Sequence, residues 1–125
     1  MPGVLKIDRK RKLAVSTFYG AVSDEDILTH RNTILDSPAF DPSFSEVVDF
    51  SRVSSLTVSE AALSAMAQVK SIFNETSIHV VVAPADIAFQ LVSQYRELAR
   101  VTRPNLYVVR SVDEAYAVLD SARDS

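Results

Sequence analysis

The stretch Ile78-His79-Val80-Val81-Val82-Ala83 is the segment that decides the fold. It is almost entirely apolar and rich in β-branched residues, as expected of a central strand that is covered on both faces. Pro84 ends this strand, because proline has no N–H group to offer a ladder of hydrogen bonds. Such a strand is typical of a parallel sheet that carries helices on its faces.

Strand and helix patterns alternate on either side of this segment. Further strands are expected where β-forming residues cluster or alternate with polar ones, at Val4–Asp8, Leu13–Tyr19, Glu46–Phe50 and Leu106–Val109. Helices are expected where apolar residues recur on one face, over about 24–35, 58–73, 87–99 and 112–122. The order strand, strand, helix, strand, helix, strand, helix, strand, helix predicts an α/β fold. Its five-stranded sheet should be mixed, with an antiparallel hairpin at the start and helices packed on the faces.

Polar residues mark where the helices begin. The residues expected to start them are Ser23, Thr57, Asp86 and Ser111. Glu60 and Glu114 follow two of these residues at the spacing of a capping box. Gly20 is expected to end the second strand, since glycine allows the chain to turn there.

The composition is that of an ordinary globular protein. The 125 residues suit one domain, residues 1–125, in which 47% of residues are hydrophobic and 23% are charged. The net charge of −3 argues against nucleic-acid binding, which requires an excess of basic residues. The run Arg9-Lys10-Arg11-Lys12 is interpreted as a solvated hairpin turn, with a patch for phosphate or an acidic partner as the alternative.

No segment has the features of a signal peptide or a membrane span. Residues Met1–Lys6 lack an apolar core, and the purest apolar run, Val80–Ala83, is far too short to cross a bilayer. The absence of cysteine excludes disulfides and thiolate chemistry. We therefore expect a soluble, cytoplasmic protein.

Common catalytic motifs are missing. With two glycines there is no glycine-rich phosphate loop, and no serine stands in a Gly-x-Ser-x-Gly elbow. Two histidines are too few for a recognisable metal motif, and we expect His30 at the surface and His79 in a structural role. Asp49 and Asp86 are the best acid–base candidates, because they follow strands at the sheet edge where ligands bind. Each also has a structural explanation in a turn or a helix cap. We expect a binding module that has no cofactor and no metal, and not an enzyme.

Hydroxyl side chains gather after the third predicted strand. They belong to Ser51, Ser54, Ser55, Thr57 and Ser59, and with Asp49 they form the candidate regulatory or binding site. We interpret the segment as a turn leading to a helix N-terminus, where unpaired backbone N–H groups favour an anion such as a phosphate on a side chain. A phosphate on Ser59 would be stabilised by the helix dipole and repelled by Glu60 if that side chain is close. The alternative is that these hydroxyl groups only cap the helix and form the turn.

This segment resembles the strand–loop–helix of STAS domains, the anti-sigma-factor antagonist family with the SpoIIAA-like fold. The family pattern is an apolar strand ending in Asp-Leu-Ser, a short apolar turn, and Asp-Ser-Ser-Gly opening a helix. Val48-Asp49-Phe50-Ser51 matches the first part, and an ungapped comparison places Ser59 on the serine that a partner kinase phosphorylates in those antagonists. Thr57 and Glu60 stand where the family has aspartate and glycine. The resemblance implies the SpoIIAA-like fold for the whole chain and a regulatory role through a protein partner.

The chain also resembles a divergent branch of SpoIIAA-like proteins related to lipid-binding CRAL-TRIO domains. The shared features are the connection around Ser37–Phe40, the turn Ala83–Asp86 and the segment Ser111–Ala115. This resemblance implies a small-molecule or lipid ligand in a pocket between helices and sheet, lined by the apolar stripes of 61–73 and 87–99. The alternative is that the large side chains of these stripes only fill the core, namely Met66, Phe73, Phe89 and Tyr95. Homodimerisation through a sheet edge or an apolar helix face is a further expectation that the sequence leaves open.

Overall fold

The computed structural model describes residues 3–123, and within them the five strands and four helices follow the predicted order. The elements are β1 (Gly3–Asp8), β2 (Leu13–Ser23), α1 (Asp24–Leu35), β3 (Ser45–Thr57), α2 (Glu60–Gln68), β4 (His79–Val82), α3 (Asp86–Leu98), β5 (Leu106–Val109) and α4 (Val112–Arg123). The predicted α/β fold with a mixed five-stranded sheet is confirmed. None of the helices within this range is long and apolar enough to cross a bilayer.

The strands lie side by side in the order β1-β2-β3-β4-β5. The first pair is antiparallel and is joined by a tight turn at residues 9–12, as the basic run predicted. Each later pair is parallel, with a helix in every crossover. All four residues of β4 are buried, because this strand lies between two neighbours and has helices on both of its faces.

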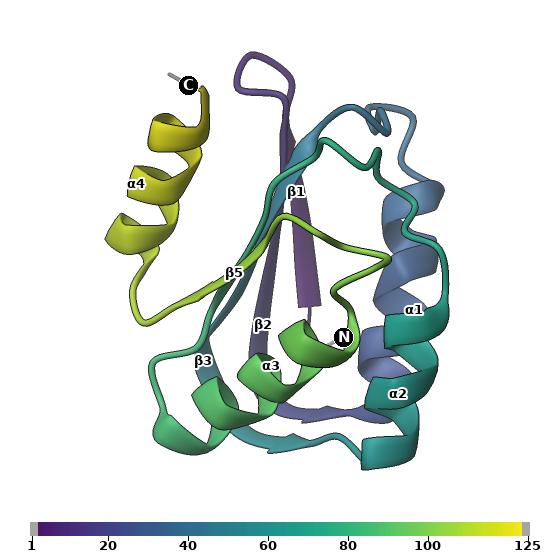
Figure 1. Ribbon diagram of the computed structural model, residues 1–125, viewed down its shortest axis with the longest axis vertical. Helices are drawn as coiled ribbons and strands as arrows, with labels where there is room; N and C mark the ends of the chain where they lie inside the picture. The colour runs from purple at the N-terminus through teal and green to yellow at the C-terminus, as the bar shows by residue number, and fades with distance from the viewer. Residues whose placement is uncertain (1–2, 124–125) are drawn as a thin grey trace.

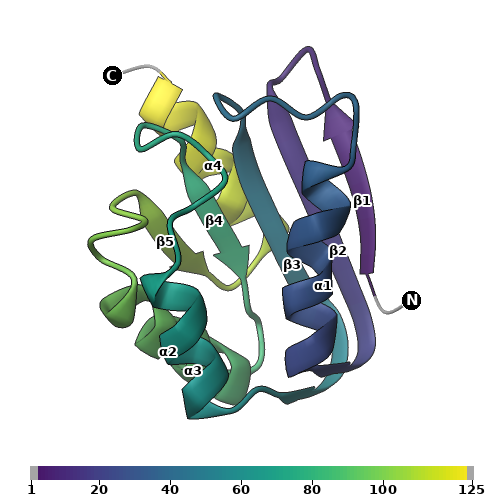
Figure 2. The ribbon, with the colours of Figure 1, turned by 90° about the vertical axis from the view of Figure 1, so that its right-hand side faces the viewer.

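The helices are divided unequally between the two faces of the sheet (Figure 1). Of the helices described, α4 alone covers one face, where Ala115 and Leu119 pack on Val47, Val80 and Val82. Helices α1, α2 and α3 cover the other face, and a second view shows α1, on the β1–β2 side of the sheet, standing apart from α2 (Figure 2). Successive residues of a strand point to opposite faces, so β2, β3, β4 and β5 supply side chains to the cores on both faces.

The predicted ends of β2 and β3 are wrong. Gly20 does not end β2, which continues to Ser23, and the stretch Ser51–Thr57 is part of β3 and not a turn. The two extensions pair in parallel as far as Ser23 and Thr57, with two register shifts that accommodate extra residues in β3. Gly20 lies at one of these shifts with a φ of +70°, a conformation that glycine adopts without strain. Backbone pairing with β2 therefore overrides the turn preference of the serines in this segment.

Two predicted helix starts also need correction. Thr57 is the last residue of β3, and Ser59 caps α2 in its place by accepting a hydrogen bond from the N–H of Ala62. Asp86 is the first residue of α3, and Ala85 occupies the cap position. The expected starts at Ser23 and Ser111 are confirmed, since the Ser111 hydroxyl accepts from the N–H of Glu114 and Ser23 precedes α1.

Helix α2 is shorter than its apolar stripe predicted. It ends at Gln68, although the stripe continues to Phe73. Side chains from the segment after α3 bind its last carbonyl groups: the Thr102 hydroxyl donates to the carbonyl of Ala67, and Arg103 donates to the carbonyl groups of Met66 and Val69. These bonds satisfy the free acceptors of the helix C-terminus, so the chain leaves the helix there.

Candidate functional site

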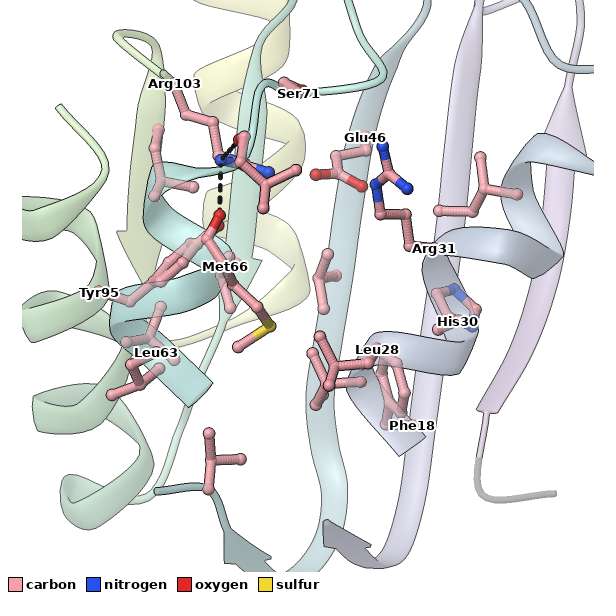
Figure 3. A pocket seen from close by; sticks show the side chains of 18 of the residues that line it. Phe18, Leu28, His30, Arg31, Glu46, Leu63, Met66, Ser71, Tyr95 and Arg103 are labelled. Carbon is pink, nitrogen blue, oxygen red and sulfur yellow. Dashed lines mark hydrogen bonds between the residues drawn. The ribbon is translucent and has the colours of Figure 1, made fainter. Parts of the chain in front are cut away.

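A cleft of about 410 Å³ lies between α1 and α2 on the face that three helices share. Its floor is β3, with Val48 and Phe50, and α3 contributes Leu91 and Tyr95. Figure 3 shows Leu28 on the α1 side and Leu63 on the α2 side of an apolar end. A volume of this size is within the range of small-molecule sites, roughly 300–1,000 Å³.

The other end of the cleft is polar. Figure 3 places Arg31, Glu46, Ser71 and Arg103 together there, above the apolar side chains. Arg103 is held by the α2 carbonyl groups at 3.1 and 3.2 Å, and its guanidinium lies 5.8 Å from the ring centre of Tyr95. Burial raises the pKa of the Tyr95 hydroxyl, and the positive charge of Arg103 opposes that rise. The cleft therefore has two chemically different ends.

His30 lies in the wall of this cleft, so the prediction of a surface position is wrong. Its ring is hydrogen-bonded to the hydroxyl of Ser16, a fully buried residue of β2. The ring of Phe18 lies 4.8 Å from it, centre to centre. Burial lowers the pKa of His30 below the ordinary value of 6.5, while the negative charge of Glu46 acts in the opposite direction. The helix periodicity did not reveal this position, because polar residues surround His30 in the sequence.

We expect the pKa of His30 in the folded protein to lie below 6.5, since burial disfavours the charged ring. As the pH falls through 6.5, the unfolded chain takes up this proton first. His30 therefore makes the folded state less stable as the pH falls below 6.5. An NMR titration of the ring protons would measure the midpoint directly. A midpoint at or above 6.5 would contradict this effect of the half-buried position.

His79 occupies the core, as predicted. It is 2% exposed, and its Nδ1 is hydrogen-bonded to Oε1 of Glu46 at 2.7 Å. The ring of Phe73 packs edge-on against it, with ring centres 5.1 Å apart. Glu46 thus lies between the buried His79 and the polar end of the cleft.

Among the residues singled out by the sequence, Ser59 has the most specific contacts. Its N–H and its hydroxyl group both donate to the carboxylate of Asp24, each at 2.9 Å. Asp24 is the first residue of α1, so this pair links the N-terminal ends of the two helices that flank the cleft. The sequence did not reveal the pair, because the two residues are 35 positions apart.

The other candidate residues do not form a cluster around Ser59. They are distributed along β3, where each residue advances the chain by roughly 3.3 Å. The exposed members of this row are Ser51, Ser54, Ser55 and Thr57. Asp49 is half-buried, and its carboxylate accepts a hydrogen bond from the N–H of Ser51 at 2.8 Å. The row is therefore a polar strand edge and not a pocket.

Asp49 and Asp86 do not share a partner. Asp49 accepts a hydrogen bond from the N–H of Ser51 within β3, and Asp86 is ion-paired with Arg110 at 2.5 Å. The guanidinium of Arg110 also donates to the carbonyl of Pro84 and lies over the ring of Phe89. Both carboxylates thus have structural contacts. Over residues 3–123, no three histidine or acidic side chains lie together in a way that could hold a metal ion.

Comparisons with known proteins identify the fold. The structure is similar to that of the anti-sigma factor antagonist SpoIIAA in its unphosphorylated form, with a TM-score of 0.55, 14% sequence identity, and coverage of 97% of both chains. It is also similar to the Bacillus cell fate determinant SpoIIAA in the phosphorylated form, with a TM-score of 0.50, 16% identity, and coverage of 92% of this chain and 96% of that one. No family model and no curated protein matches the sequence. The chain therefore has the SpoIIAA-like fold that the sequence predicted.

Proposed function

We propose that the protein is a regulatory module that binds a partner protein through the exposed end of β3 and the N-terminus of α2, with Ser59 as its switch. The observation that carries this proposal is the position of Ser59, an exposed hydroxyl at the N-terminus of the helix that follows β3. The similar SpoIIAA structures include an unphosphorylated and a phosphorylated form. The same two states are proposed here for Ser59.

The contacts of Ser59 explain how a phosphate would act. The hydroxyl that would carry the phosphate is the one that donates to Asp24. A phosphate has no proton to donate in its dianionic form and would repel the Asp24 carboxylate. The N–H groups of α2 and the helix dipole would stabilise the same phosphate. Phosphorylation would therefore break the link between α1 and α2 and leave a new negative charge on the surface.

The hydroxyl row of β3 supports a protein partner. Ser54, Ser55 and Thr57 are exposed on the part of β3 that extends beyond β4, which ends at Val82. Short hydroxyl side chains can donate and accept hydrogen bonds with little loss of conformational entropy. This surface adjoins Ser59, so a partner bound there would be sensitive to its charge.

Phosphate should be found on Ser59 when the protein is isolated from its own cells. Native mass spectrometry followed by phosphopeptide mapping would measure this, with Ser54 and Ser55 as internal controls in the same region. A co-purifying protein should then bind Ser59→Ala and Ser59→Asp with affinities changed in opposite directions, because only the second variant imitates the added charge.

Equal binding of both variants to a proven partner would rule out the switch. A matched pair, Ser55→Ala and Ser55→Asp, would show whether any charge on this surface has the same effect. A response at Ser55 as large as that at Ser59 would assign the effect to general electrostatics.

A second function is favoured by the cleft itself. A core filled by the large side chains of α2 and α3 would leave no space between the helices and the sheet. In this chain Met66 and Tyr95 line an opening of about 410 Å³. We propose that this opening holds a small apolar ligand.

A further inference from the structure

The polarity of the cleft indicates which class of ligand it would hold. The apolar end is bounded by Leu28, Leu63 and Phe18, and the opposite end by Arg31, Ser71 and Arg103 (Figure 3). A ligand that fills both ends must itself be apolar at one end and polar at the other. The two arginines at the polar end of the cleft favour a ligand whose polar end is negatively charged.

The charged side chains at the polar end differ in their hydrogen-bond partners. Glu46 is hydrogen-bonded to the buried His79, and its side chain is 16% exposed. Arg31 is exposed and has no hydrogen-bond or ion-pair partner among residues 3–123. Arg103 is fixed by carbonyl groups, which orient its charge but do not neutralise it. The polar end thus has two guanidinium groups and one carboxylate, which leaves an excess of one positive charge.

We propose that the cleft binds a single-chain amphiphile with an anionic head group, of the fatty-acid type. The chain would lie between Leu28 and Leu63, and Arg31 would bind the carboxylate, with Arg103 on the opposite wall. Guanidinium groups bind carboxylates through paired hydrogen bonds, which favours this head group over a neutral one. The inference specifies the ligand of the second function above and does not depend on the switch at Ser59.

The physical balance favours an anion over a cation of the same length. Each buried methylene of the tail contributes the same binding free energy whatever the head group, because the hydrophobic effect depends on the apolar area buried and not on charge. A cationic head group would be repelled by the excess positive charge of this end, where two arginines face one glutamate. A neutral head group would neither gain nor lose from them. Probes with the same tail therefore isolate the contribution of the head group.

Three probes with matched tails test the proposal on the full chain: decanoate, decanol and decyltrimethylammonium. The two ionic probes are used below their micelle-forming concentrations and decanol below its solubility limit. Binding would be measured by calorimetry and by the NMR signal of the Met66 methyl group, which lies in the cleft. We expect decanoate to bind with the highest affinity and to shift the Met66 signal. Equal affinity for all three probes would overturn the anionic head group, and no binding of any probe would overturn the cleft as a ligand site.

Variants at both ends give matched controls. Arg31→Gln should weaken decanoate binding roughly tenfold, while Arg9→Gln in the hairpin turn removes the same charge and should change it by less than about twofold.

Leu28→Asp and Leu98→Asp replace leucines that are 49% and 48% exposed, and only the first lines the cleft. The first should weaken decanoate binding roughly tenfold and the second should not. Equal effects within either pair would overturn the assignment. Because all four residues are exposed or half-exposed, the variants should fold, and an unchanged NMR spectrum away from the substitution would verify this.

Discussion

Replacing Leu119 by alanine should lower the free energy of unfolding by about 2–5 kcal/mol. Leu119 is 2% exposed and is one of the side chains that attach α4 to the sheet. Its removal leaves a cavity beside Val80 and Val82, in a core that no other helix of residues 3–123 covers. Urea denaturation would measure the loss as a lower midpoint with an unchanged slope. A loss of this size is a large fraction of the roughly 5–15 kcal/mol that stabilises a typical domain.

A leucine on another helix provides the control. Leu98→Ala removes the same atoms from a side chain that is 48% exposed, so the expected loss is about 1 kcal/mol or less. Because α4 covers the face opposite the cleft, Leu119→Ala should leave the affinity for decanoate unchanged under conditions where the variant is folded. Equal losses from the two leucines would mean that α4 contributes little to the core.

Replacing Glu46 by alanine should cost about 1–3 kcal/mol of stability, because it leaves His79 buried without its hydrogen-bond partner. Glu46→Gln keeps an oxygen and a nitrogen that can bond to the ring, so it should cost much less. The same two variants should lower the pKa of His30 further, since each removes the negative charge that opposes the effect of burial. Thermal unfolding and the His30 titration would report the two consequences separately.

An exposed glutamate serves as the control for Glu46. Glu97 is 68% exposed and pairs with Arg100 at 3.3 Å, so Glu97→Ala should change stability by about 0.5 kcal/mol or less. A cost for Glu46→Gln as large as that for Glu46→Ala would show that the carboxylate charge, and not the hydrogen bond, stabilises this site.

Local patterns along the chain were sufficient to predict the fold. Hydrophobic periodicity located every element, and the buried β4 indicated a parallel sheet with helices on both faces. The ends of strands and helices were predicted less well where contacts with distant parts of the chain determine them. Ser51, Ser54 and Ser55 suggested a turn, but this stretch continues β3 because Arg52, Val53 and Ser55 pair with β2, while Ser51 and Ser54 lie at the two register shifts. The stripe of α2 suggested a longer helix, but Thr102 and Arg103 bind the carbonyl groups where α2 ends.

The candidate site could be predicted only in part. The hydroxyl groups of the β3–α2 segment pointed to a helix N-terminus there, and Ser59, two residues beyond the expected Thr57, caps the helix. The partner of Ser59, Asp24, looked like one of three ordinary acidic residues in a first helical turn. Arg31 and Glu46 belong to no sequence motif. They come together only in the folded structure, where α1 and β3 form the cleft. A spacing within one segment cannot reveal contacts between segments that are distant in the chain.

The strands lie in the sheet in the same order as they occur in the chain. During synthesis each new strand therefore joins an outer edge, and none has to enter between two strands that are already paired. Pairing between elements that are close in sequence forms quickly, since little chain entropy is lost in closing short loops. Until β4 leaves the ribosome, however, the edge of β3 offers unpaired backbone groups beside apolar side chains. We expect a chain interrupted before His79 to aggregate, and the same hazard to pass to the edge of β4 until β5 pairs with it.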